Sequence, residues 1–171
     1  MCYQPSKDYG PDYIDQIKAC AGQFRLTVVE DTRWPGWWCK LAAFERGGNF
    51  LLADLDTIFV DTLPIPNRLT MLRDFYRPQR LQSGLMWVTA DAAALAWRVF
   101  KHDPEGTMQR FRGDGEFLAW LFPHARTWQD DYPGKVVSYK VHCKGGPPDG
   151  AAVICYHGKP RPRDTGWSTT R

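Results

Sequence analysis

The sequence contains no cysteine pair at metal-binding spacing, no long apolar run and no strong excess of charge. Its five cysteines lie at positions 2, 20, 39, 143 and 155 and form no C-x-x-C pair, which disfavours a disulfide framework and a zinc site. The sequence shows no basic-then-apolar leader and no uncharged run of membrane-spanning length. We therefore expect a cytoplasmic protein with reduced thiols and no membrane span.

The composition is that of an ordinary globular chain. With 171 residues, 43% of them hydrophobic and 24% charged, one domain covering residues 1–171 is expected. The net charge of +3 permits an anionic ligand but does not by itself indicate nucleic acid. Aromatic residues make up 14% of the chain, which fits either a ring-lined binding surface or a well-packed core.

Apolar periodicity predicts alternating helices and strands in the first half of the chain and mainly strands later. Helices are expected after Pro11 and at 38–46, 90–102 and 115–122, and strands at 25–29, 51–62, 69–75, 81–89, 135–143 and 151–157. Thr89 is expected to cap the helix 90–102, and Gly84 to break the strand 81–89 near its start. The alternation favours an α/β fold with a mixed sheet flanked by helices.

Two aspartates stand out in the segment LLADLDTIFVDT (51–62). Its Leu, Ile, Phe and Val residues predict a buried strand, and Asp54 and Asp56, two residues apart, would share one face of it. Carboxylates in apolar surroundings are costly unless they are paired or bind a metal. Because oxygen ligands suit Mg²⁺ or Mn²⁺, we favour a metal site over the alternative in which Asp54 caps a helix and Asp56 faces solvent.

One family with such a pair is the haloacid-dehalogenase-like phosphatases. The segment DLDTIFVDT resembles their DLDGTLVDT motif, which would make Asp54 a nucleophile and Asp56 its acid/base partner. Here Ile58 stands where that family has Thr, and a long segment precedes a motif that normally opens the core sheet. This phosphatase remains the alternative interpretation.

Further segments resemble another family in the same order along the chain. These segments are GWWCKLAAF (36–44), LLADLDTIFVD, LQSGLMWV, RGDGEFL, VVSYKVHC and VICYHGKPRP. Together they resemble the nucleotide-sugar glycosyltransferases of the GT-A fold, and most closely the small bacterial and phage-type relatives of glycosyltransferase family 8. The match extends from about residue 8 to about residue 167.

The resemblance implies both a fold and an activity. The fold is a single GT-A-like, Rossmann-like domain with a shortened first strand, in which residues 155–171 close over a diphosphate. The activity is transfer of a sugar from a nucleoside-diphosphate sugar, with a UDP-sugar favoured, and with retention of the anomeric configuration. The cofactor is Mn²⁺ or Mg²⁺, and an imidazole ligand favours Mn²⁺.

The resemblance also assigns roles to individual residues. Asp54, Asp56 and His157 are the implied metal ligands, and Asp114 is placed near the reacting carbon. The implied donor-binding residues are Tyr9, Lys40, Asp74, Ser83, Gly84, Gly158 and Lys159. The structural alternatives are an exposed helix lysine at 40, a helix-capping Asp114, a histidine with satisfied hydrogen bonds at 157 and a solvated Lys159.

Two departures from the family pattern keep a further alternative open. The family motif GDQ is GDG here, so Gly115 lacks an amide, and the first strand is short. A degenerate transferase that binds nucleotide sugars without turnover fits both departures. The acceptor also stays open, because the mildly basic tail suits a nucleic acid, a glycan or the donor alone.

Overall fold

The computed structural model of the protein describes residues 2–3, 24, 27 and 29–166. Tyr9, the expected helix after Pro11 and most of the expected strand 25–29 lie outside the described residues. Within the described part, no helix is both long and apolar enough to span a membrane. The fold is α/β, with mixed sheets flanked by helices in a single compact domain, as the sequence predicts.

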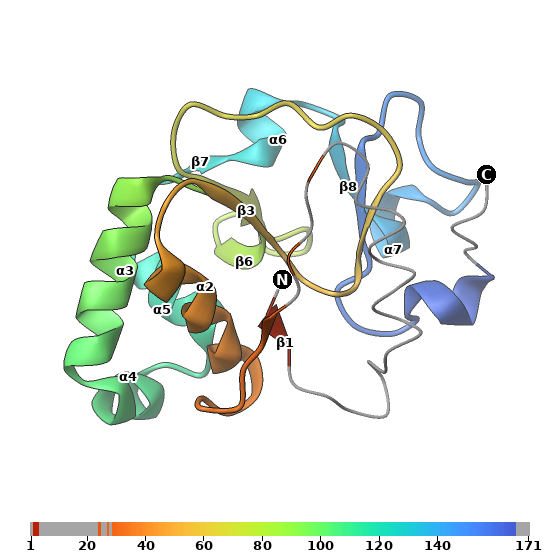
Figure 1. The fold of residues 1–171 in the computed structure, drawn as a ribbon. Coiled ribbons are helices and arrows are strands. Elements are labelled where there is room, and N and C mark those ends of the chain that lie inside the picture. Colours follow the sequence, from red (N-terminus) through yellow and green to blue (C-terminus); the bar gives the residue numbers. More distant parts are fainter. Residues whose placement is uncertain (1, 4–23, 25–26, 28, 167–171) are drawn as a thin grey trace.

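Two mixed sheets form the framework (Figure 1). The first has the order β3 (Phe50–Ala53), β6 (Leu81–Val88), β5 (Thr70–Arg73), β7 (Arg126–Thr127). In it, β6 runs antiparallel to β3 and β5, and β7 is parallel to β5. The second has the order β4 (Thr57–Phe59), β9 (Val153–Cys155), β8 (Val136–Ser138), with β4 antiparallel and β8 parallel to β9. The sequence predicted one sheet; the structure has these two, together with a short parallel pair of β1 (Cys2–Tyr3) and β2 (Val29–Glu30).

Helices flank both sheets. The 3₁₀ helix η1 (Gly36–Lys40) leads into α2 (Leu41–Arg46), and α3 (Ala90–His102), α4 (Pro104–Arg110) and α5 (Asp114–Leu121) complete the layer beside the first sheet (Figure 1). The remaining helices are short: α6 (Trp128–Asp131), α7 (Tyr139–His142) and the 3₁₀ helix η2 (Pro162–Thr165).

Two main hydrophobic cores support the described part of the fold. Beside the first sheet, Trp38, Phe100 and Phe117 pack with Met71 and Met86, and such large rings remove a large apolar area from water. The second core is built on β9 and joined to the first sheet by Trp128, whose indole N–H donates to the carbonyl of Leu85 at 3.1 Å. The two sheets therefore have fixed positions relative to each other.

The helix 38–46 is confirmed as η1 followed by α2, and the helix 90–102 is confirmed as α3. Thr89 precedes α3, but its side chain makes no capping hydrogen bond. Asn49 caps the helix instead, because its Oδ1 accepts from the Ala90 N–H at 2.7 Å. The break expected at Gly84 is present only as an irregularity in pairing: β6 is continuous from Leu81 to Val88, but its register with β5 shifts between Gln82 and Trp87.

Two expected strands are shorter than predicted. The strand 51–62 is divided into β3 and β4 by a turn at residues 54–56, in which Thr57 N–H donates to the Asp54 carbonyl at 3.1 Å. The strand 135–143 ends at Ser138, whose Oγ accepts from Val141 N–H at 3.2 Å and caps α7. A backbone hydrogen bond closes the first turn and a side-chain cap begins α7, and each ends its strand despite the apolar pattern.

Candidate functional site

The turn that carries Asp54 and Asp56 lies where the two sheets meet. Asp54 follows β3 and its N–H donates to the Gly84 carbonyl of β6 at 2.9 Å, while the carbonyl of Asp56 accepts from Tyr156 N–H after β9 at 3.0 Å. The pair was expected on one face of a strand. Because it lies on a turn, the two carboxylates have different partners.

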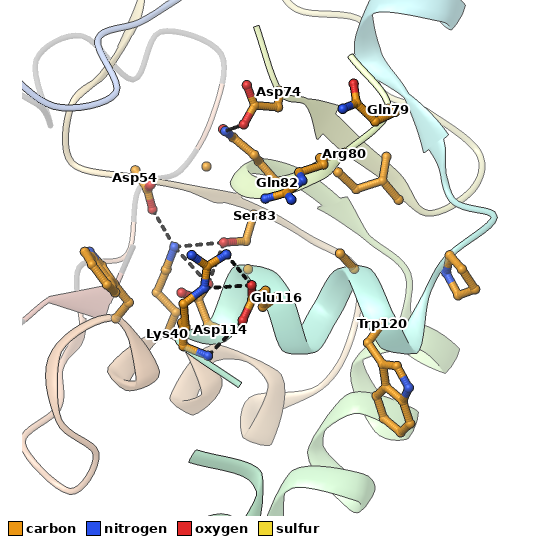
Figure 2. Close-up of a pocket in the computed structure, with 18 residues that line it drawn as sticks. Lys40, Asp54, Asp74, Gln79, Arg80, Gln82, Ser83, Asp114, Glu116 and Trp120 are labelled. Atoms are coloured by element: carbon orange, nitrogen blue, oxygen red, sulfur yellow. Dashed lines mark hydrogen bonds and ion pairs between the residues drawn. The ribbon is translucent and has the colours of Figure 1, made fainter. Parts of the chain in front are cut away.

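Asp54 belongs to a buried polar network centred on Lys40 (Figure 2). Lys40 is only 5% exposed, and its Nζ lies 2.8 Å from Asp54 Oδ1, 2.9 Å from Asp114 Oδ2 and 3.1 Å from Ser83 Oγ. Ser83 Oγ in turn donates to Asp114 Oδ2 at 2.6 Å. An ammonium group has three donors, so this network uses the full donor capacity of Lys40.

Burial and the neighbouring charges shift the pKa values of Lys40 and Asp54. Burial lowers the pKa of Lys40, but the carboxylates of Asp114 and Asp54 outweigh it, so its pKa is raised. Burial also raises the pKa of Asp54; Lys40 opposes this rise, and the carboxylates of Asp56 and Asp114 add to it. The side chain of Asp54 is 37% exposed, so this carboxylate joins the buried network to the open cleft beside it.

A glycine leaves room for the network at Gly115, where a Cβ would lie 3.2 Å from Ser83 Oγ. At Gly84 a Cβ would lie 3.4 Å from Asp54 Oδ2, which is an ordinary contact distance. Gly115 is the position where the sequence departs from the family's GDQ. The departure lets the start of α5 approach β6 closely at the point where Asp114 meets Ser83.

Asp56 is held by the segment that follows β9. Its Oδ2 accepts from the Gly158 N–H at 3.1 Å and from Arg161 Nη1 at 2.6 Å. His157 and Gly158 have φ values of 37° and 103°, in the left-handed region that glycine adopts without strain. This bend turns the chain back towards Asp56, so the expected approach of residues 157–158 to the aspartates is present in the backbone.

The imidazole of His157 points to other partners. Its Nε2 lies 2.6 Å from Ser138 Oγ, and its ring stacks on Phe75 with centroids 5.4 Å apart. Burial and then the charge of Lys140 lower the pKa of His157, while Asp56 and Asp74 oppose this. Because the pKa lies below its ordinary 6.5, the imidazole is neutral at pH 7.

The three implied metal ligands are not assembled into a metal centre in this structure. Among residues 2–3, 24, 27 and 29–166, no group of three or more His, Cys, Asp or Glu side chains is placed to hold a metal ion. Side-chain cations stand beside the carboxylates instead, with Lys40 on Asp54 and Arg161 on Asp56. A divalent ion at Asp56 requires the guanidinium of Arg161 to move away.

The other predicted residues are more peripheral. Asp74 accepts from the N–H groups of Tyr76 and Arg77 at 2.8 and 2.9 Å and from Gln82 Nε2 at 2.6 Å, so its carboxylate already organises a turn at the cleft margin. Lys159 is exposed beside Gly158.

An open cleft of about 840 Å³ joins the Lys40 network to the margin of the first sheet. Predicted site residues line it: Lys40, Asp54, Asp74, Ser83, Gly84 and Asp114. Trp37, Arg112 and Trp120, which the sequence analysis did not single out, also line it. Asp56, His157, Gly158 and Lys159 lie outside this lining, on the far side of the Asp54–Asp56 turn.

The sequence analysis also missed Lys140 and Arg161. Lys140 Nζ donates to the His157 carbonyl at 3.1 Å, but its position in an alternating apolar segment predicted an ordinary strand residue. Arg161 was counted only as part of a basic tail. Its place four residues after His157 in a Pro- and Gly-rich segment was the available signal that it returns to the site.

Comparison with models of known protein families finds no match to this chain. The search of curated proteins likewise finds no similar sequence. The functional argument therefore depends on the residues of the site.

Proposed function

We propose that the protein is a GT-A-like glycosyltransferase that moves a sugar from a nucleoside-diphosphate sugar, preferably a UDP-sugar, to an acceptor. One observation supports this most directly: Lys40, Asp54, Ser83 and Asp114 come from four separate segments and form one hydrogen-bonded network at the cleft. These are four of the positions at which the sequence resembles metal-binding, donor-binding or catalytic residues of that family.

The network suits recognition of a sugar. Carboxylate oxygens accept hydrogen bonds from hydroxyl groups, and Asp54 is open to the cleft. Lys40 fixes the separation of Asp54 and Asp114 and compensates their charge. We assign Asp114, at the start of α5, to the reacting carbon, where a carboxylate stabilises positive charge that develops on the sugar ring.

The far side of the Asp54–Asp56 turn suits the diphosphate. Lys140 and the exposed Lys159 lie on either side of the bend at Gly158. Negative charge develops on the leaving diphosphate as the bond to the sugar breaks, and fixed ammonium groups stabilise that charge. We propose that this segment holds the diphosphate and that the anomeric configuration is retained.

A divalent ion, Mn²⁺ or Mg²⁺, is part of the proposal. Two carboxylates and a neutral imidazole are chemically suitable donors for it, although Arg161 must leave Asp56 and the His157 ring must turn from Ser138 to complete the set. Such an ion supplies neutralisation of the leaving diphosphate.

Ligand-induced thermal stabilisation tests this function. A ligand present at one hundred times its Kd stabilises the folded state by about 2.7 kcal/mol, so we expect UDP or a UDP-sugar with Mn²⁺ to raise the melting temperature. We expect D56N to lose the Mn²⁺-dependent part of the shift. The matched control is D149N, which changes an exposed carboxylate outside the cleft.

Slow release of UDP from a UDP-sugar is the accompanying activity measurement. Hydrolysis of p-nitrophenyl phosphate that is lost in D54N, with no response to nucleotide sugars, would establish the phosphatase alternative. Binding of a nucleotide sugar without release of UDP or transfer would establish the degenerate binding protein. No response to any nucleotide or nucleotide sugar overturns the proposed function.

A further inference from the structure

The cleft extends from the Lys40 network along α5, and two tryptophans line it: Trp37 lies against Gly113 at the start of α5, and Trp120 lies near the end of α5. Trp37 is 69% exposed and Trp120 is 47% exposed. Figure 2 shows Asp114 at one end of α5 and Trp120 towards the other. Tryptophan rings normally contribute most of their large apolar area to a core or an interface, so two exposed rings on one polar cleft indicate a binding surface.

Each ring lies against a neighbouring part of the chain. Trp37 lies against Gly113, where an added Cβ would come within 3.2 Å of its Cε3 atom. The ring of Trp120 lies 5.3 Å from that of Phe111, and the guanidinium of Arg110 is 4.8 Å from its centroid. Rigid aromatic side chains lose little conformational freedom on binding, which favours affinity.

Charged side chains line the same cleft as the two tryptophans. Arg112 donates from its backbone N–H and its Nε to Glu116, at 2.9 and 2.8 Å, and both side chains are largely exposed at the cleft. A saccharide ring presents C–H groups on its faces and hydroxyl groups around its edge. Flat apolar rings beside charged hydrogen-bonding groups match both parts of that surface.

The charged side chains that line the cleft favour a neutral ligand over a polyanion. Lys40, Arg80 and Arg112 are its cationic side chains, and Asp54, Asp74, Asp114 and Glu116 are its carboxylates. The cationic side chains do not outnumber the carboxylates, and most of them are paired with one. Nucleic-acid binding depends on neutralising phosphates with unpaired Lys and Arg residues, so this lining favours an uncharged partner.

We propose that Trp37 and Trp120 form the acceptor subsite and that the acceptor is a neutral saccharide. This inference rests on the proposed function, because it places the acceptor beside the assigned donor-sugar site at Asp114. In the transfer, a hydroxyl oxygen of the acceptor bonds to C1 of the donor sugar while the bond from C1 to the diphosphate oxygen breaks. The diphosphate leaves with the electron pair and takes the proton of the hydroxyl group.

Fluorine NMR of protein labelled with 5-fluorotryptophan tests the subsite. The probes are maltotriose, cellotriose, lactose and chitotriose, with oligothymidylate and a heparin hexasaccharide as polyanions. We expect at least one neutral saccharide to shift the Trp37 and Trp120 resonances, which W37F and W120F assign. W37A and W120A should each weaken that binding by about tenfold, or 1.4 kcal/mol, and I65A, which trims an exposed apolar side chain outside the cleft, should leave it unchanged.

The outcomes separate this inference from the proposed function. Shifts caused only by the polyanions, or no shift with any neutral saccharide, overturn the acceptor subsite even where a UDP-sugar stabilises the protein. Saccharide binding at the two tryptophans with no response to nucleotide sugars keeps the saccharide site and overturns the transferase. If W37A and W120A unfold, the W37F and W120F proteins still report whether a saccharide reaches each ring.

Discussion

At the scale of single residues, a buried ammonium group holds the carboxylates of the cleft in place. Ionised groups are costly to bury, and a buried pair is stable only when hydrogen bonds satisfy both partners. Lys40 meets that condition through Asp54, Asp114 and Ser83. The ammonium group of Lys40 therefore positions the two carboxylates, and in the proposed function it would act on a sugar mainly through Asp54 and Asp114.

Lys140 provides a prediction at the scale of single residues, because its charge lowers the pKa of His157. In K140M, removing this positive charge should raise the pKa of His157 above the wild-type value, since Lys140 is one of the causes that lower it. Titration of the imidazole resonances by NMR measures the change. K144M, which removes an exposed lysine, is the control, and an unchanged pKa in K140M would contradict the prediction.

The lowered pKa of His157 also predicts the direction in which the stability of the fold changes with pH. Because the folded-state pKa of His157 lies below 6.5, the unfolded chain binds more protons, and this contribution to stability is lost as the pH falls from 6.5 through the folded-state pKa. The loss should be smaller in K140M than in the wild type. Urea denaturation at several pH values measures it.

At the scale of elements, the ends of helices depend on partners that are distant in sequence. The pattern of α3 predicted its span, and Thr89 was the local candidate for its cap. The structure uses Asn49, which precedes β3 and lies beside the start of α3 because β3 pairs with β6. Local sequence therefore predicted the helix but not the residue that caps it.

Removal of the Asn49 side chain should lower the free energy of unfolding more than removal of the Thr89 side chain. A side-chain cap contributes about 1 kcal/mol, so N49A should lower the free energy of unfolding by about that amount. T89A should have a much smaller effect, because its hydroxyl makes no capping hydrogen bond. Urea denaturation of both variants measures the difference, and equal losses would show that the assignment of the cap is wrong.

At the scale of the whole molecule, the sequence predicted which segments belong to the site better than how they are joined. The apolar run around Asp54 and Asp56 is a strand pattern, and only pairing with two different strands, β6 and β9, divides it. The resemblance brought Lys40, Ser83 and Asp114 to the same site as Asp54, and the structure joins them. It did not predict Arg161 beside Asp56, because a contact between positions so distant in sequence depends on how the chain folds back.

The pair of Arg161 and Asp56 connects the end of the chain to the junction of the two sheets. Both side chains are largely buried, and the contact is a charge-assisted hydrogen bond of 2.6 Å, so R161M should lower the free energy of unfolding by about 1.5–3 kcal/mol. R163M is the matched control, because the guanidinium of Arg163 lies 3.8 Å from exposed Asp164 and surface pairs contribute about 0–1 kcal/mol. Chemical denaturation measures both.

The same variant tests the divalent ion. Arg161 occupies the side of Asp56 that a metal would need, so its removal takes away a competing cation. Mn²⁺ should then stabilise R161M more than it stabilises the wild type or R163M, measured as the rise in melting temperature at equal Mn²⁺ concentration. If R161M loses stability but gains no response to Mn²⁺, Asp56 is a partner for the C-terminal segment and not a metal ligand, and the proposed diphosphate site would depend on lysine side chains alone.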